Sequence, residues 1–250
     1  MNSQSDAPKQ YTMSNLLNLL LVSSSRVHGK NYLEHCRSSV ADHFASAENV
    51  VFVPFALQDH QRYESIVAPV FADVGLALRS IHHAPDPIKA IAEADGIFIG
   101  GGNSFRLLKT LYDLELIPAL QQAVQGRGVP YMGSSAGTNM TCPTIRTTND
   151  MPIVQPPSFE ALGLIPFQIN PHYIDADPNS THKGETREQR LAEFHEENSL
   201  PVAGLREGSW LKVTGSSCEL AGETGMKLFR HGQDAQEIQA GDVSYLLSDD

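Results

Sequence analysis

The chain has 250 residues, of which 41% are hydrophobic and 19% are charged, so it is long enough to bury a substantial core. Its formal net charge of −11 argues against a nucleic-acid-binding protein and against a polybasic membrane contact, because both require a basic surface. Three widely spaced cysteines without a Cys-x-x-Cys pair predict neither a disulfide framework nor a zinc knuckle, and they favour the reducing cytoplasm.

Residues 1–14 are polar and lack a basic stretch followed by an apolar one, so we expect a disordered leader rather than a signal peptide. The apolar run at 16–22 is too short to span a membrane and indicates a buried strand. No repeat, low-complexity tract or linker divides the remainder. Residues 15–250 are therefore predicted to form a single α/β domain.

Short β-rich runs alternate with longer helical patterns through the first half of the chain. Strands are predicted at residues 16–23, 50–55, 76–81, 96–99 and 129–132. Helices are predicted at residues 32–44, 63–74, 87–93, 104–114 and 117–125. This alternation predicts a parallel sheet with helices on both faces. In such a sheet, ligands bind beyond the carboxyl ends of the strands.

The second half of the chain is less regular. Seven prolines between 143 and 178 predict loops that carry site residues. A strong helical pattern follows at 185–197. The stretch 201–247 reads as short strands with glycine-containing turns, and we expect it to form a hairpin-rich edge of the same sheet.

The pattern GSSAG at 133–137 lies between the predicted strand at 129–132 and a short helical pattern at 136–140. In a strand–turn–helix setting, Gly-x-Ser-x-Gly holds the central serine in a strained conformation, while the glycines keep Cβ atoms out of the turn. The following helix aims its N–H groups at a developing oxyanion. Ser135 is therefore the candidate nucleophile. The alternative interpretation is a tight turn rich in small residues.

A second glycine-rich turn, GGGN at 100–103, also lies between a predicted strand and a predicted helix. It lacks the Gly-x-Gly-x-x-Gly pattern and the P-loop lysine, which disfavours a nucleotide site. Three glycines allow the backbone to approach a substrate carbonyl and lend it an N–H, as in an oxyanion loop. The alternative is a plain turn in which Asn103 caps the next helix.

A serine nucleophile needs a base, and histidine is the usual one because its pKa lies near neutrality. His172 is favoured among the ten histidines because it follows the apolar run at 164–169, at the end of a predicted strand. His82 and His83 precede Pro85 on the way to a surface helix, and we expect them to be solvated. The histidines within helical patterns are read as helix-face residues: His35, His43 and His195.

A third group should be a carboxylate that fixes the imidazole tautomer. Asp150 gives the chain order Ser–Asp–His, whereas Glu207, just after the apolar run 201–205, gives Ser–His–Glu. The residues alone leave both open, and either carboxylate is also explained as a cap for backbone N–H groups in a turn.

Six segments spread over the chain match one known family: IGGGN at 99–103, GSSAG at 133–137, CPTIRTTNDMPIV at 142–154, QINPH at 168–172, HKGETREQR at 182–190, and the turn Glu207-Gly208-x-Trp210. They resemble the peptidase E family of serine peptidases, also called α-aspartyl dipeptidases. The resemblance covers nearly the whole chain from Leu16 onward, and the blocks at 142–154 and 182–190 are its most specific parts.

The resemblance implies a fold related to the glutaminase domain of class I glutamine amidotransferases, a flavodoxin-like arrangement, with a serine in place of their cysteine nucleophile. It implies hydrolysis of dipeptides and short peptides with an N-terminal aspartate, through an acyl-enzyme and without a metal or cofactor. The expected partner is thus a small peptide in the cytoplasm, with no nucleic acid and no membrane.

Carried over position by position, Ser135 is the nucleophile, His172 the base and Glu207 the third member. Asp150 is kept as a substrate-binding candidate. The expected oxyanion hole is formed by Gly101, Gly102 and Ala136. Ser134 stands at a position where the family is expected to have a bulkier residue such as tryptophan. We expect this smaller side chain to alter the pocket wall.

Selecting an aspartyl side chain requires a cation or several N–H donors, and arginine suits a planar carboxylate better than lysine. Arg187, within the block at 182–190, is the first candidate and Arg146 the second. The alternative for Arg187 is an exposed helix face. Asp150 is the candidate acceptor for the substrate's α-ammonium group, and Asn103 is also expected to contact the substrate.

Two other functions stay open at this point. One is a related serine exopeptidase that acts on cyanophycin-type aspartate–arginine polymers, and the other is a non-catalytic ligand-binding module that keeps the serine turn. An amidotransferase glutaminase is disfavoured because no cysteine stands at the centre of GSSAG, and Cys142 lies beyond the following helix.

Overall fold

The computed structural model describes residues 16–179, 181 and 183–248. The leader predicted at 1–14 lies outside the described residues. Within this part of the chain, no helix is both long and apolar enough to cross a bilayer.

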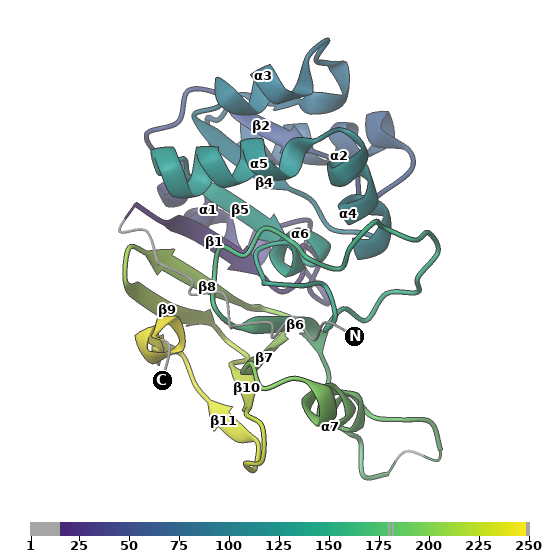
Figure 1. Cartoon of the computed structure of the whole chain (residues 1–250). Coiled ribbons are helices and arrows are strands. Elements are labelled where there is room, and N and C mark those ends of the chain that lie inside the picture. The colour runs from purple at the N-terminus through teal and green to yellow at the C-terminus, as the bar shows by residue number, and fades with distance from the viewer. Residues whose placement is uncertain (1–15, 180, 182, 249–250) are drawn as a thin grey trace, which may run out of the picture.

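The larger of two sheets has eight strands in the order β12-β9-β8-β1-β5-β4-β2-β3 (Figure 1). Its parallel strands are β1 (Asn18–Val22), β2 (Val50–Val53), β3 (Leu78–Ser80), β4 (Gly96–Ile99) and β5 (Tyr131–Ser134). Its antiparallel strands are β8 (Ser209–Thr214), β9 (Ser217–Gly222) and β12 (Gly241–Asp242). The sheet is therefore mixed rather than parallel, and only the strands from the first half of the chain follow the parallel pattern.

The second sheet contains strands from the C-terminal half in the order β11-β10-β7-β6. They are β6 (Gln168–Tyr173), β7 (Val202–Arg206), β10 (Met226–Phe229) and β11 (Gln236–Ile238). The hairpin-rich edge expected from residues 201–247 is formed by β8, β9 and β12, whereas β7, β10 and β11 belong to the second sheet instead. β6 and β7 are parallel neighbours joined through α7 (Arg187–Glu197), because parallel strands need a crossover connection.

Helices cover both faces of the large sheet (Figure 1). The remaining α-helices are α1 (Arg37–His43), α2 (His60–Ala72), α3 (Pro87–Ala92), α4 (Ser104–Asp113), α5 (Leu116–Gln121) and α6 (Ala136–Asn139). Short 3-10 turns are η1 (Glu34–Cys36), η2 (Ile81–His83) and η4 (Ser244–Leu247), and η3 (Gln122–Gly126) is a π-helical turn that continues α5.

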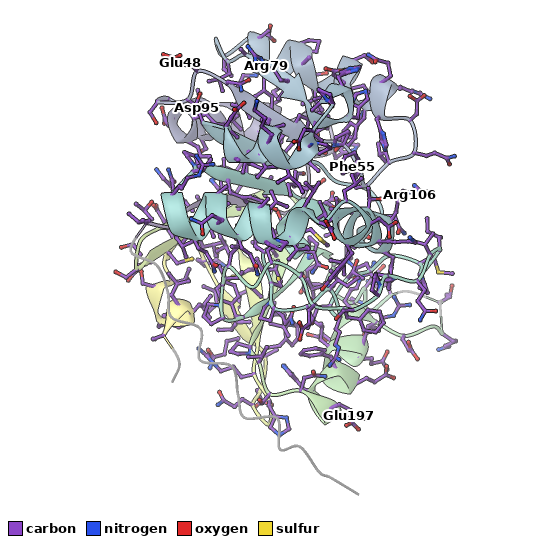
Figure 2. The ribbon with its side chains drawn as sticks, turned by 45° about the horizontal axis from the view of Figure 1, so that its top comes forward. Glu48, Phe55, Arg79, Asp95, Arg106 and Glu197 are labelled. Carbon is purple, nitrogen blue, oxygen red and sulfur yellow. The ribbon has the colours of Figure 1, made fainter. Side chains whose placement is uncertain are left out.

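Alternating side chains of β1 supply two cores, as a pleated strand between two helical layers requires. Leu19 and Leu21 pack with α3, α4 and α5, whereas Leu20 and Val22 pack with α1 and α2. The first of these cores also takes in apolar residues of the second sheet, among them Ile169, so the two sheets share one interior. Charged side chains such as Arg79, Asp95 and Glu197 lie at the periphery, whereas Phe55 is buried (Figure 2).

His43, the last residue of α1, is buried against the large sheet. Its Nε2 lies 3.0 Å from the carbonyl oxygen of Tyr131, and its Nδ1 has no partner among the described residues. Burial lowers the pKa of His43 to about 4, and the hydrogen bond to Tyr131 opposes this only in part.

We therefore expect an acid-dependent loss of stability from this residue. The unfolded chain binds the proton near pH 6.5, whereas the folded chain binds it only near pH 4. His43 therefore leaves the free energy of unfolding unchanged above about pH 6.5 and lowers it as the pH falls towards about 4, by roughly 3 kcal/mol in all. Denaturant unfolding of the wild type and of His43→Gln between pH 4 and 8 measures the difference. A constant difference across this range would contradict the prediction.

Candidate active site

Ser135 occupies the turn between β5 and α6. Its backbone has φ 53° and ψ −111°, a combination rare for a residue with a Cβ atom. The N–H of Ser135 donates to the carbonyl of Val22 at the end of β1, 3.0 Å away. The strand–turn–helix setting and the strained serine predicted from GSSAG are therefore both present.

The two glycines of GSSAG are required because no side chain fits at their positions, and not because their backbone conformation favours glycine. A Cβ atom at Gly133 would lie 2.5 Å from the carbonyl oxygen of Gly137, and one at Gly137 would overlap the carbonyl oxygen of Ile99 in β4. The close contacts of α6 with β5 and with β4 thus exclude any side chain at these positions. Ser134 is fully buried and does not line the pocket, so its expected effect on the pocket wall is not found.

His172 lies on β6, one residue before the strand ends. It adopts φ 54° at a bulge in the pairing with β7, which turns the residue out of the regular strand. Its N–H donates to Oγ of Ser23 (2.9 Å), which in turn donates to the carbonyl of Leu205 (2.7 Å). Ser23, at the end of β1, thereby ties the two sheets together at the site. Nε2 of His172 lies 2.8 Å from Oγ of Ser135.

Glu207 completes a chain of three side chains. It follows β7, and its Oε1 lies 2.6 Å from Nδ1 of His172. Asp150, the other carboxylate left open by the sequence, instead accepts hydrogen bonds from the N–H of Ser104 (2.7 Å) and the hydroxyl of Thr148 (3.1 Å). A carboxylate on Nδ1 leaves Nε2 free to accept the serine proton. The side chains of His172 and Glu207 are 35% and 45% exposed, so water reaches this pair.

The glycine-rich turn lies against the nucleophile. A Cβ atom at Gly101 would lie 3.0 Å from Cβ of Ser135 and crowd the nucleophile, and Gly102 has φ 140°, where any side chain is strained. Burial raises the pKa of Tyr63, while a hydrogen bond from the Gly101 backbone to its hydroxyl lowers it. The N–H groups of Gly102 and Ala136 have no acceptor among the described residues.

A pocket of about 820 Å³ opens in front of Ser135 and His172. Asp150 lines it, as do Tyr63 and Ile66 of α2. The loop after β1 contributes three basic residues that the sequence reading missed: Arg26, His28 and Lys30. Their position directly after a predicted parallel strand is the signal that points to them.

Arg187 is the first residue of α7 and is half-buried. Burial and the neighbouring Arg190 lower its pKa, and the charge of Asp150 raises it, so its guanidinium lies within electrostatic reach of Asp150. Its side chain forms no hydrogen bond or ion pair with any other described residue. Arg187 is thus a partly desolvated cation without a fixed partner.

The other two substrate-binding candidates have structural partners. Arg146 is exposed and donates to Oδ1 of Asn198 at the opposite end of α7, 3.3 Å away. Asn103 caps α4 by accepting from the N–H of Arg106 and donates to the carbonyl of Met151. The capping role considered for Asn103 is therefore present.

The comparison with protein families matches residues 19–221 to peptidase family S51. Peptidase E of Streptomyces coelicolor is 56% identical over 232 residues, which cover 92% of this chain and 95% of that protein. A probable alpha-aspartyl dipeptidase of Drosophila melanogaster is 48% identical over 94% of this chain and 99% of its own.

Solved structures give the same fold at lower identity. A putative peptidase E from Listeria monocytogenes superimposes with a TM-score of 0.64 at 21% identity, over 83% of this chain and 98% of that one. A peptidase from an acI-B1 actinobacterium superimposes with a TM-score of 0.63 at 18% identity, over 90% of this chain and 95% of that one.

Proposed function

Since the chain belongs to peptidase family S51, we propose that it is a serine dipeptidase that hydrolyses dipeptides and short peptides after an N-terminal aspartate. The observation that carries the proposal is the continuous hydrogen-bonded chain from Ser135 through His172 to Glu207, with distances of 2.8 and 2.6 Å. Both contacts lie within the range needed for proton transfer.

In the proposed reaction, the Ser135 hydroxyl attacks the aspartyl carbonyl while Nε2 of His172 takes its proton. Glu207 stabilises the imidazolium that forms. The imidazolium then gives the proton to the leaving amine, and an ester between Ser135 and the aspartyl group remains. Water, deprotonated by His172, attacks this ester; the proton passes from His172 to Oγ of Ser135 as the ester bond breaks and aspartate is released.

The oxyanion formed in each step needs N–H donors. The free N–H groups of Gly102 and Ala136 support their role as the two donors. The missing side chain of Gly101 lets the turn approach Ser135. We keep Gly101, together with Gly102 and Ala136, as part of the proposed oxyanion hole.

An N-terminal aspartate carries a cationic amine and an anionic side chain on neighbouring atoms. Asp150 lies on the pocket wall, and Arg187, which is not itself a lining residue, lies within electrostatic reach of that carboxylate. We propose that Asp150 accepts the α-ammonium group and that Arg187 binds the aspartyl carboxylate.

Three further properties belong to the same proposal. The nucleophile at the carboxyl end of a parallel strand supports a relation to the glutaminase domain of class I amidotransferases. The shared core supports a single domain from residue 15 onward. Three buried, free thiols support a cytoplasmic location: Cys36, Cys142 and Cys218.

A panel of Asp-Leu, Glu-Leu, Asn-Leu, Ala-Leu and β-Asp-Arg tests the substrate class. We expect wild-type kcat/KM to be highest for Asp-Leu, and replacing Arg187 with methionine to lower that value by about 10²-fold. The value of kcat/KM for Ala-Leu should change little, because its first residue has no side-chain carboxylate for Arg187 to bind. The matched control is Arg190→Met, which removes an exposed arginine paired with Glu185.

Equal wild-type rates for Asp-Leu and Ala-Leu would contradict a cationic pocket. A preference for β-Asp-Arg over Asp-Leu would favour the exopeptidase for aspartate–arginine polymers instead.

A further inference from the structure

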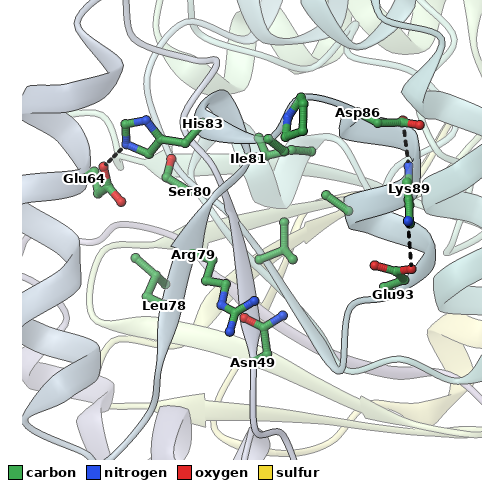
Figure 3. A pocket seen from close by; sticks show the side chains of 14 residues that line it. Asn49, Glu64, Leu78, Arg79, Ser80, Ile81, His83, Asp86, Lys89 and Glu93 are labelled. Atoms are coloured by element: carbon green, nitrogen blue, oxygen red, sulfur yellow. Dashed lines mark hydrogen bonds and ion pairs between the residues drawn. The ribbon is translucent and has the colours of Figure 1, made fainter.

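A cluster of metal-ligand side chains lies outside the active-site pocket, where η2 meets the first turns of α2. One ring nitrogen of His82, one of His83 and one carboxylate oxygen of Glu64 all lie within 4.8 Å of one another. Figure 3 shows Glu64 and His83 facing each other across the gap, with Nε2 of His83 2.8 Å from Oε2 of Glu64. Side chains from α2 and from the turn after β3 thus converge on one point.

His82 is not solvated as the sequence reading expected. It is half-buried, and its Nε2 is shielded from water and has no partner among the described residues. Its Nδ1 lies 2.6 Å from Oγ of Ser80, itself buried. Metal-binding histidines are commonly held in this way, with one ring nitrogen on a structural partner and the other free for the ion.

His60 adds a third imidazole to the same place. It stands four residues before Glu64, one turn away on the same face of α2, and its ring centroid lies 5.6 Å from that of His82. Imidazole nitrogens with one carboxylate are a donor set that suits zinc and neighbouring transition metals, whereas calcium and magnesium prefer oxygen ligands.

We propose that Glu64, His82 and His83 bind a divalent transition-metal ion of the zinc class, with His60 within reach as the fourth ligand. Zinc holds nitrogen and oxygen ligands at about 2.0–2.2 Å, so rotation of these side chains must draw their donor atoms closer than the present spacing. Glu64 and His83 are 18% and 55% exposed, which leaves the ion a route to its ligands.

Access comes from an adjoining pocket of about 560 Å³, whose wall includes Ser80, His83 and Glu64 (Figure 3). The bound ion would join the end of β3 to α2. That helix also carries Tyr63, which lines the catalytic pocket. The ion would therefore stabilise the fold from outside the catalytic pocket, and its binding is independent of the proposed peptidase reaction.

Titration of Zn²⁺ into chelator-stripped full-length protein, followed by calorimetry, tests the site. We expect one ion per chain with micromolar or tighter affinity, and Glu64→Gln and His83→Gln should each weaken binding by about 10-fold or more. His231→Gln, at an exposed histidine outside the cluster, is the control and should bind as the wild type does.

Two measurements on the same proteins separate ligation from misfolding. Co²⁺ should give the visible bands of a low-symmetry nitrogen–oxygen site in the wild type and lose them in Glu64→Gln, while circular dichroism of the ion-free variants stays native. Zn²⁺ should raise the Tm of the wild type and not that of Glu64→Gln. Absence of stoichiometric binding in the wild type, or equal affinity in Glu64→Gln and His231→Gln, would overturn the proposal.

Discussion

Replacement of Ser135 by alanine is expected to lower kcat/KM for Asp-Leu by about 10⁵-fold, the largest effect of any single substitution in this chain. The hydroxyl is the atom that attacks, and no other group in the hydrogen-bonded chain to Glu207 can replace it. Activity that survives reflects only the N–H groups of Gly102 and Ala136 and the binding of substrate.

The same substitution should leave the fold intact. Alanine keeps the Cβ atom, so the strain at φ 53° is present in both proteins, and the loss is confined to the 2.8 Å hydrogen bond with His172. Thermal unfolding should show nearly the same Tm. Ser134→Ala is the matched control, because this neighbouring hydroxyl is buried and has no partner among the described residues.

A serine-directed organophosphonate provides a second measurement that does not depend on knowing the substrate. Wild type and Ser134→Ala should be labelled at one site, and Ser135→Ala should not. Labelling that persists in Ser135→Ala, or unchanged turnover, would remove Ser135 from the reaction. A wild-type protein that resists labelling would favour the non-catalytic binding module.

The features that the sequence predicts well depend on neighbours along the chain. β4 forms at 96–99 as the sequence predicts, because three apolar residues after Gly96 end at a glycine-rich turn. GSSAG predicts its turn because the atoms that leave no space for a side chain at Gly133 and Gly137 belong to residues a few positions away and to the adjoining strand. His172 was favoured by its place at a strand end, and it lies there.

The features that the sequence missed depend on segments that meet only after folding. The second sheet requires β6 to pair with β7 across α7, a choice that strand patterns do not reveal. His82 is shielded by contacts with α2, from which the strand β3 separates it along the chain. Asp150 was a candidate to orient His172, yet its carboxylate accepts from Ser104, 46 residues earlier.

Glu207→Gln carries the second largest expected effect, a fall in kcat of about 10³-fold with little change in KM. Glutamine fits the same space, but its amide can donate to Nδ1 and so leave the proton on Nε2, where it blocks acceptance from the Ser135 hydroxyl. Replacing a fully buried carboxylate in this role by its amide lowers kcat by about 10⁴-fold. The 45% exposure of Glu207 lets water compete for Nδ1 and reduces the expected loss.

Asp150→Asn is the comparison that assigns the two carboxylates. Because Asp150 lines the pocket and bonds to Ser104 rather than to His172, its loss should raise KM for Asp-Leu and change kcat by less than Glu207→Gln does. Steady-state kinetics on both variants separates the two roles, since an orienting group acts on the chemical step and a binding group on substrate affinity. The reverse pattern, with kcat lost in Asp150→Asn and kept in Glu207→Gln, would transfer the orienting role to Asp150 and require a rearranged loop at 147–152 during turnover.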